Sequence, residues 1–338
     1  MDLTAVEELC RAVAAAPAVV PTGAGTHRGV GAPVVDPDGS AVALDAPAGI
    51  VDLQPSDMTV TVGAGTPVAE LAEALAEHGQ ECPLDPRWPD ATVGGTLATG
   101  LSGMRRLRHG PLRDRVLEVR FVTGTGRAVR GGGPTVKNVT GYDVPRLLVG
   151  SLGTLGLLTQ VTLRTQPRPE HTAWWEADGE PSAWRTRLHR PACIAWDGRR
   201  TWVLLEGHAA DVAAEAAAHL LAPADAPAPP DGPHRGRIAV APHRLGEVGA
   251  RLADLDVRWL AEVGVGTVHV ATDTEADLAA ARAVAHDVDG WLLREEGAPG
   301  LDPFGRPLPN AGLHARIKAA FDPEGKLNPG RLPYEAAS

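Results

Sequence analysis

A basic cluster next to a glycine-rich loop is the first group of side chains in this sequence that could do chemistry. Its members are Arg105, Arg106, Arg108 and His109. Guanidinium groups donate paired hydrogen bonds to phosphates and carboxylates. The cluster could therefore hold a pyrophosphate or the carboxylate of a substrate, and we take Arg105 and Arg106 as candidates for that role. A solvated or subunit-facing patch is an equal alternative, because the turn at Gly110-Pro111 could send these side chains outward.

Two further positions could move protons. Tyr142, which precedes Asp143, could belong to a proton relay, although a structural hydrogen bond explains a tyrosine equally well. His269 lies in a strand-like Thr-Val-His-Val pattern, where a histidine could bind a substrate or a metal. The sequence shows no second histidine two residues away and no obvious carboxylate partner. We therefore favour a structural role for His269 and expect no metal site.

Three separated loops are rich in glycine. They span residues 21–29, 91–100 and 150–156, and a polar stretch at 137–144 precedes the last of them. Glycine lets a backbone approach a ligand closely, because no Cβ stands in the way. Together the loops predict one large, phosphate-bearing ligand that is held along much of its length.

The segments around these loops mix helical and strand patterns. Helices are expected at 3–16 and from Thr66-Pro67, as cap and first position, to Gly79. Strands are expected at 18–20, 42–44, 59–62, 116–122 and 161–165. Beyond a proline-rich break at 166–170, a helix is expected near 211–221, a strand at 266–270 and a helix at 275–286. Residues 223–233 predict a flexible surface segment, and a short helix begins near 313. The mixture is typical of an α+β protein.

Composition excludes several classes of function. The 338 residues carry a net charge of −10, which disfavours a nucleic-acid partner. The three cysteines, Cys10, Cys82 and Cys193, have no cluster spacing, so the chain should hold no iron–sulfur cluster and no disulfide framework. An acidic N-terminus and the absence of a long apolar run indicate a cytoplasmic protein without a membrane span.

Taken together, the motifs resemble the FAD-binding proteins of the vanillyl-alcohol oxidase and p-cresol methylhydroxylase (PCMH) type. The order of the loops carries this resemblance, together with Gly79-Gln80 followed by Pro83 and Pro86, the segments 101–106 and 137–144, and the terminal Asn328-Pro-Gly-Arg331. Within that group the chain is most similar to the FAD-binding subunits of bacterial glycolate oxidases. The resemblance implies a PCMH-type FAD-binding domain at 1–167, a smaller α+β cap at 168–309 and a C-terminal segment at 310–338 that returns to the first domain.

The resemblance also implies roles for residues in each loop. The first loop would wrap the pyrophosphate, the second would approach the phosphates and the flavin ring, and the third would lie near the ribityl chain. The backbone at Val161 would reach the adenine, and Asn328 would return to the ring. The implied cofactor-binding residues are Thr22, Gly23, Ala24, Gly25, Thr26, His27, Arg28, Thr92, Val93, Gly94, Gly95, Thr96, Gly100, Ser151, Gly153, Thr154, Gly156, Val161 and Asn328.

One position departs from the pattern of these proteins. Many of them hold the flavin covalently through a histidine directly after the glycines of the first loop. Here Thr26 takes that place and His27 follows one residue later. We therefore expect non-covalent FAD.

The function implied by the resemblance is oxidation of a 2-hydroxy acid to a 2-oxo acid, with hydride transfer to flavin N5, in a subunit of a glycolate oxidase or dehydrogenase complex. Such complexes contain a second FAD subunit and an iron–sulfur subunit. Two alternatives remain open. One is a self-sufficient FAD oxidase or dehydrogenase of another alcohol or hydroxy acid, and the other is a non-catalytic flavin-binding assembly subunit. A nicotinamide enzyme is disfavoured, because the first glycine loop lacks the helix and acidic residue of that fingerprint.

Overall fold

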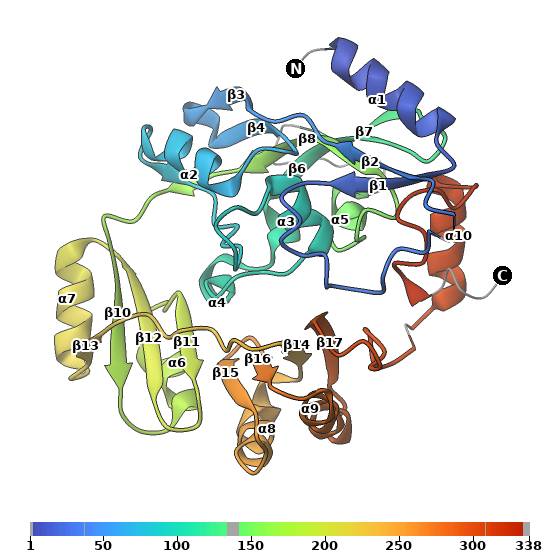
Figure 1. The fold of residues 1–338 in the computed structure, drawn as a ribbon. Coiled ribbons are helices and arrows are strands. Elements are labelled where there is room, and N and C mark those ends of the chain that lie inside the picture. The colour runs from blue at the N-terminus through green and yellow to red at the C-terminus, as the bar shows by residue number, and fades with distance from the viewer. Residues whose placement is uncertain (1–2, 37, 134–141, 308, 334–338) are drawn as a thin grey trace.

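The computed structural model describes residues 3–36, 38–133, 142–307 and 309–333. Figure 1 shows an upper part built from both ends of the chain and a lower part built from its middle. We call the lower part, from His171 to Glu296, the cap. The upper part, from Leu3 to Pro167, is the N-terminal domain, and the C-terminal helix joins it. The mixture of helices and antiparallel sheets confirms the α+β class.

A five-stranded antiparallel sheet forms the centre of the N-terminal domain, in the order β3-β4-β8-β6-β7. Its strands are β3 (Ile50–Gln54), β4 (Thr59–Gly63), β6 (Val116–Val122), β7 (Ala128–Gly132) and β8 (Leu157–Arg164). β8 is buried on both faces along nearly its whole length, which explains its continuous run of uncharged residues. The predicted strands at 59–62, 116–122 and 161–165 are confirmed, whereas β3 and β7 lack a clear pattern in the sequence.

The two ends of the chain meet beside this sheet. β1 (Ala18–Thr22) pairs in parallel with β2 (Ala41–Asp45), and Leu327 forms a bridge with Val19. The terminal helices are α1 (Leu3–Ala15) and α10 (Ala311–Phe321). Lys318 of α10 is buried and donates from Nζ to the carbonyl of Thr154 at 2.9 Å. The C-terminal segment is therefore tied directly to the third glycine loop.

Two helices follow glycine-bearing turns in this domain. α3 (Val93–Thr99) begins after Thr92, whose hydroxyl accepts a hydrogen bond from the Gly95 N–H at 3.2 Å. α2 (Val68–Ala76) begins one residue later than expected, because Pro67 occupies the cap position. The Thr66 hydroxyl donates instead to the Gly63 carbonyl at 2.6 Å. The prediction of Thr66 as the cap was wrong because its side chain closes the preceding turn.

An eight-stranded antiparallel sheet forms the cap, in the order β13-β10-β12-β11-β15-β16-β14-β17. Its strands are β10 (His171–Ala177), β11 (Cys193–Trp196), β12 (Thr201–Gly207), β13 (Ala222–Ala224), β14 (His234–Ala239), β15 (Arg258–Glu262), β16 (Thr267–Thr272) and β17 (Trp291–Glu296). The cap helices α7 (Ala209–Ala218), α8 (Leu245–Leu252) and α9 (Glu275–Asp287) build its apolar clusters with the sheet. In Figure 1, α8 and α9 lie below the sheet, away from the N-terminal domain.

The segment from 223 to 233 lies on the surface, as predicted, and most of its residues are exposed. Its first residues belong to β13, which pairs with β10. Pro230 is buried, and its carbonyl accepts a hydrogen bond from Arg87 Nη2 at 2.7 Å. The segment therefore contacts the N-terminal domain, and its flexibility stays a prediction.

The remaining elements are short. They are β5 (Gln80–Glu81), which pairs with β9 (Gln166–Pro167), the helices α4 (Arg106–His109), α5 (Val144–Leu148) and α6 (Trp184–Arg187), and the 3₁₀ turns Pro55–Asp57, Leu112–Arg115, Pro181–Ala183 and Pro242–Arg244. In the described part of the chain, no helix has the length and apolar character needed to cross a bilayer.

Candidate functional site

The glycine loops converge on one large cavity in the N-terminal domain. This loop cavity has a volume of about 580 Å³. Its walls come from residues 20–28, from the start of α3, from residues 152–158 and from Asn328 and Arg331 of the C-terminal segment. The predicted cofactor residues that line it are Thr22, Gly23, Ala24, Gly25, Thr26, His27, Arg28, Thr92, Gly94, Gly95, Gly153, Gly156 and Asn328. The structure therefore brings parts of all three loops and the C-terminal motif to one space.

The first loop offers backbone donors without protein partners. Within the described residues, the N–H groups of Gly23, Ala24, Gly25 and Thr26 donate to no protein acceptor. A Cβ added at Gly23 would lie 2.5 Å from the Thr92 hydroxyl, and Gly25 has φ +73°. The first and second loops thus touch at a point where only glycine fits. Consecutive backbone N–H groups without protein partners can donate hydrogen bonds to the oxygens of a phosphate.

The C-terminal segment adds two buried polar atoms that lack a hydrogen-bond partner. They are Asn328 Oδ1 and Arg331 Nε. Asn328 Nδ2 donates to the Leu152 carbonyl at 2.7 Å, which fixes the side chain on the cavity wall. Buried polar groups are usually satisfied, so these atoms fit a ligand that offers both a donor and a negative charge. The lining therefore fits FAD, which carries both.

Six predicted cofactor residues do not line the loop cavity. They are Val93, Thr96, Gly100, Ser151, Thr154 and Val161. Val161 is fully buried in β8, between Val62 and Val119 of the neighbouring strands. Gly100 ends α3 with φ +68° and packs against Gly150. These residues pack beneath the loops. A sequence motif does not tell which of its residues line a cavity and which pack beneath it.

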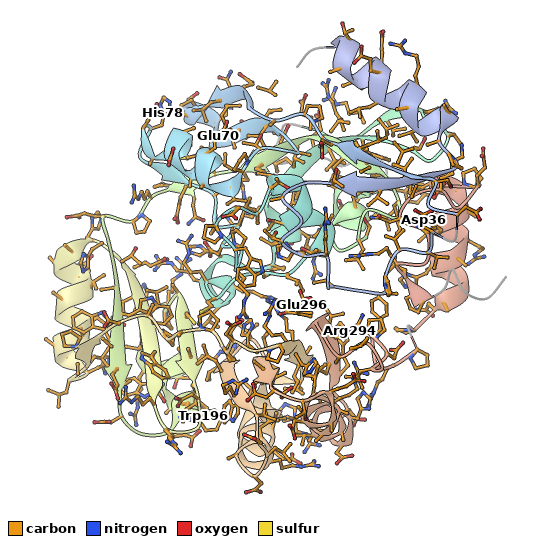
Figure 2. The ribbon with its side chains drawn as sticks, in the orientation of Figure 1. Asp36, Glu70, His78, Trp196, Arg294 and Glu296 are labelled. Atoms are coloured by element: carbon orange, nitrogen blue, oxygen red, sulfur yellow. The ribbon has the colours of Figure 1, made fainter. Side chains whose placement is uncertain are left out.

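A second cavity lies where the N-terminal domain meets the cap. This junction cavity has a volume of about 300 Å³ and shares Thr26 and His27 with the loop cavity. Its polar lining from the cap comes from β14, β16 and β17, namely Arg235, Arg237, His269, Glu295 and Glu296. Glu296 is labelled in Figure 2 between the two parts of the molecule. A ligand in the junction cavity would therefore lie next to the contents of the loop cavity.

Strand register places a histidine beside an arginine in the junction cavity. His269 on β16 lies directly opposite Arg237 on β14. His269 Nε2 is 2.6 Å from Glu262 Oε1. Because the carboxylate is an acceptor, Nε2 carries a hydrogen, and Nδ1 has a lone pair whenever the imidazole is neutral. Nδ1 has no hydrogen-bond partner in the described residues, so it can accept a proton. The sequence missed this carboxylate partner, which lies on another strand.

Arg237 is held by two contacts that leave donors free. Its Nε donates to Glu295 Oε1 at 2.9 Å and its Nη1 donates to the Ser102 carbonyl at 3.0 Å. Burial alone would raise the pKa of Glu295, but the charges of Arg237, His269 and Arg87 lower it below its ordinary value. Glu295 is therefore an anion that orients Arg237. Nη2 of Arg237 has no hydrogen-bond partner among the described residues and can bind a substrate carboxylate.

Arg105 lines the same cavity but has little donor capacity left. Nε and Nη2 donate to the two oxygens of Asp85, at 2.8 and 2.6 Å. Nη1 donates to Glu81 at 2.8 Å and to Glu206 of the cap at 3.0 Å. Three carboxylates neutralise this guanidinium. Arg105 joins the two domains through Glu206, and the substrate-binding role predicted for it stays a prediction.

The other two predicted catalytic residues lie away from both cavities. Arg106 is exposed on α4, and Tyr142 is 95% exposed. Neither lines the loop cavity or the junction cavity. Residues 137–141 of the motif before Tyr142 lie outside the described residues.

Arg87, Arg235, Arg237 and Glu295 were not predicted from the sequence as site residues, and Arg331 was named only as the end of the terminal motif. A usable signal existed for one pair, because Arg235 and Arg237 alternate around Gly236 in a strand pattern and so share a face. In the described residues, no group of three or more His, Cys, Asp or Glu side chains is placed to hold a metal ion.

Comparisons with known proteins agree with this geometry. Residues 2–132 match the FAD binding domain family. The chain is 31% identical to glycolate oxidase subunit GlcE of Escherichia coli over 97% of its own length and 96% of that protein. Glycolate oxidase subunit GlcD of Bacillus subtilis is 35% identical over 36% of this chain and 26% of its own length. Mitochondrial D-lactate dehydrogenase [cytochrome] of Arabidopsis thaliana is 42% identical over 36% of this chain and 21% of its own length.

Among solved structures, alkyldihydroxyacetonephosphate synthase superposes with a TM-score of 0.67 at 16% identity, covering 96% of this chain and 74% of that one. This likeness supports the PCMH-type fold alone. The match to GlcE covers nearly both whole chains, and the domain match identifies FAD as the cofactor. The chain belongs to the glycolate oxidase subunit GlcE family of FAD-dependent oxidoreductases.

Proposed function

We propose that this protein oxidises a 2-hydroxy acid to a 2-oxo acid in the junction cavity, as a subunit of a glycolate oxidase-type complex. The observation that carries the proposal is the pair formed by His269 and Arg237, side by side in a cavity that adjoins the loop cavity. The relatives named as glycolate oxidase subunits and D-lactate dehydrogenases favour this substrate class.

Each residue of the pair has a distinct task. Arg237 Nη2 would bind the substrate carboxylate, with Glu295 holding the guanidinium in place. His269 Nδ1 would take the hydroxyl proton, with Glu262 fixing the tautomer through Nε2. When bound, FAD supplies the acceptor for the hydride that leaves the α-carbon, at N5. The protein's part is to orient the carboxylate and the proton acceptor around one carbon atom.

The proposal includes partners for the electrons. Cys10 on α1, Cys82 in the loop after β5 and Cys193 on β11 are free, so this chain offers no cysteine cluster within the described residues. A second FAD subunit and an iron–sulfur subunit would carry the electrons onward. Turnover by the isolated chain with an artificial acceptor would favour a self-sufficient oxidase or dehydrogenase instead.

The test is flavin reduction without oxygen, followed by absorbance, for the FAD-loaded chain alone and in its complex. We expect His269→Gln to slow reduction by a 2-hydroxy acid by about 10²–10⁴-fold, the usual contribution of a general base. His208→Gln is the matched control, because the His208 side chain is 81% exposed and lies outside both cavities.

Two outcomes would contradict the proposal at different points. Reduction of His269→Gln at the wild-type rate would remove His269 as the base. If no 2-hydroxy acid reduced the wild-type flavin in either preparation, the function itself would be wrong and the non-catalytic assembly subunit would be favoured.

A further inference from the structure

The junction cavity contains two arginines that the proposed reaction does not use. Arg87 precedes α3 in the N-terminal domain, and Arg235 lies on β14 of the cap. Their guanidinium carbons lie 5.2 and 5.3 Å from the centre of the Trp88 ring. Trp88 thus holds both cations through cation–π contacts, at the boundary between the two domains.

These two guanidinium groups have only weak counter-charges. Arg87 Nη2 and Arg235 Nη1 lie 3.5 and 3.3 Å from the same oxygen of Asp231, whose side chain is 75% exposed. Arg235 Nη2 lies 3.7 Å from Glu296, which is 47% exposed. By contrast, the arginine side chains are only 17% and 15% exposed. Long contacts to solvated carboxylates contribute little, so Asp231 and Glu296 compensate only a small part of the positive charge of the two guanidinium groups.

The arginines also act on each other. Burial lowers the pKa of Arg87 and the nearby charge of Arg235 lowers it further, while the carboxylate of Glu295 opposes this effect. An anion placed between the two arginines would relieve their repulsion and gain charge-assisted hydrogen bonds. Arg87 Nη2 donates to the Pro230 carbonyl and Arg235 Nη1 to the Gly232 carbonyl. The other N–H groups of these two cavity-lining side chains have no hydrogen-bond partner among the described residues.

Arg87 and Arg235 lie at some distance from Arg237 and His269, the pair proposed to bind and oxidise the substrate. Arg235 and Arg237 are two residues apart on one strand and share a face, so their side chains lie about 7 Å apart along it. Besides its charged residues, the cavity is lined by the apolar side chains of Trp88, Trp174, Leu204 and Leu260. The volume of about 300 Å³ greatly exceeds the needs of a two-carbon acid. The space fits a longer substrate with an apolar middle and an anionic far end.

We propose that Arg87 and Arg235, held by Trp88, form a second anion subsite that selects 2-hydroxy acids carrying a distal carboxylate. This inference rests on the proposed function for the identity of the near end, which Arg237 and His269 would bind. The preferred substrate class is then the 2-hydroxydicarboxylates with a short methylene spacer. Short monocarboxylates would bind through Arg237 alone.

Binding of product-like acids tests the subsite without turnover. The probes are 2-oxoglutarate and 2-oxopentanoate, which have the same chain length but differ in the distal carboxylate. They are titrated calorimetrically into the FAD-loaded full-length chain. We expect 2-oxoglutarate to bind at least about tenfold more tightly than 2-oxopentanoate, the effect of one good charge-assisted contact. The ratio of the two affinities is the readout.

Variants test whether the two arginines cause this difference in affinity. Arg235→Gln and Arg87→Gln should each bring the ratio toward one, whereas Arg235→Lys should retain part of it because the charge remains. Arg200→Gln is the matched control, because the Arg200 side chain is 64% exposed and its one ion pair with a described residue is a 3.8 Å contact with Glu176. Either glutamine variant suffices, so a folding failure of one leaves the test intact.

The outcomes separate this inference from the proposed function. Equal affinity of the wild-type protein for both acids would overturn the subsite, even if glycolate or lactate reduces the flavin. A preserved ratio in both glutamine variants would overturn it as well. Calorimetric binding of inorganic sulfate that is lost in the variants, with no advantage for 2-oxoglutarate, would reveal a simple anion site and also overturn it. A ratio that depends on the arginines, in a protein whose flavin no hydroxy acid reduces, would support the subsite and refute the proposed reaction.

Discussion

At the scale of single residues, Arg331 carries a charge that no nearby carboxylate balances in the described part of the chain. Its Nη1 and Nη2 donate to the carbonyls of Arg28 at 3.0 Å and Val30 at 2.5 Å. Burial lowers the pKa of Arg331, and no acidic neighbour opposes that effect. Arginine nonetheless remains charged in proteins. A phosphate in the loop cavity would supply the counter-charge that the protein itself lacks.

We therefore expect Arg331→Gln to weaken FAD binding by about ten- to a hundredfold, since a hydrogen bond to a charged group contributes about 1.5–3 kcal/mol. Titration of the apoprotein with FAD, followed by flavin fluorescence, measures this change. Arg11→Gln is the control, because Arg11 is exposed on α1 and its side chain hydrogen-bonds, among the described residues, only to the Glu7 carbonyl. Unchanged affinity in a normally folded Arg331→Gln protein would mean that Arg331 does not face the cofactor's phosphates.

At the scale of elements, Arg105 and the short helix α4 connect the N-terminal domain to β12 of the cap. Arg105 contacts Glu206 at 3.0 Å, and the Arg108 guanidinium donates to the Glu206 carbonyl at 2.7 Å. His109 Nε2 lies 3.0 Å from the other oxygen of Glu206, whose side chain is 1% exposed. Burial would raise the pKa of Glu206, but the contacts with His109 and Arg105 lower it below its ordinary 4.5. A buried anion thus links the two domains.

Removing Arg105 should leave this anion without its main counter-charge. We expect Arg105→Gln to lower the free energy of unfolding by roughly 3 kcal/mol at neutral pH. Arg146→Gln, which breaks the exposed pair with Asp114, should cost at most about 1 kcal/mol. Because the folded pKa of Glu206 is lowered, its stabilisation is complete above pH 4.5 and is lost as the pH falls through the folded value. Chemical denaturation that ranks the two variants equally would disprove this role of Arg105.

The way the elements pack explains which parts of the site could be predicted from the sequence and which could not. The first glycine loop was predictable, because the need for glycine at Gly23 and Gly25 arises from local backbone geometry and close approach. The junction cavity was not, because it depends on which residues of β14, β15 and β16 lie opposite one another. Register joins Arg237 to His269 and brings Glu262 beside them. Likewise, nothing near Arg105 in the sequence indicates that Glu206 would be its partner.

At the scale of the whole molecule, FAD is a ligand that only the folded chain can bind. The loop cavity needs residues from the first loop, α3, the third loop and the C-terminal segment at once. The α+β class and the order of the loops were predictable from local patterns. The burial of Ser151, Thr154 and Val161 in the core, away from the cavity, could not be predicted, because burial depends on the complete fold.

The midpoint of thermal unfolding should therefore rise with FAD concentration. At a hundredfold excess over Kd the expected stabilisation is about 2.7 kcal/mol. FMN, which lacks the adenylate half, is the control and should give a smaller shift.

We also expect acid precipitation to release the flavin, as Thr26 in place of histidine predicts. Colour that stays in the acid pellet would instead indicate a covalent link, with His27 as the first residue to test.

The joining of the two chain ends has a consequence for biosynthesis. Val19 accepts the backbone N–H of Asn328, and Arg331 reaches Arg28 across 303 residues of sequence. A ribosome has therefore translated every residue from 19 to 331 before the last wall of the loop cavity exists. A premature stop at residue 327 would leave the glycine loops intact but the cavity open. The complete cavity should be available to the flavin only after residue 331 has left the ribosome.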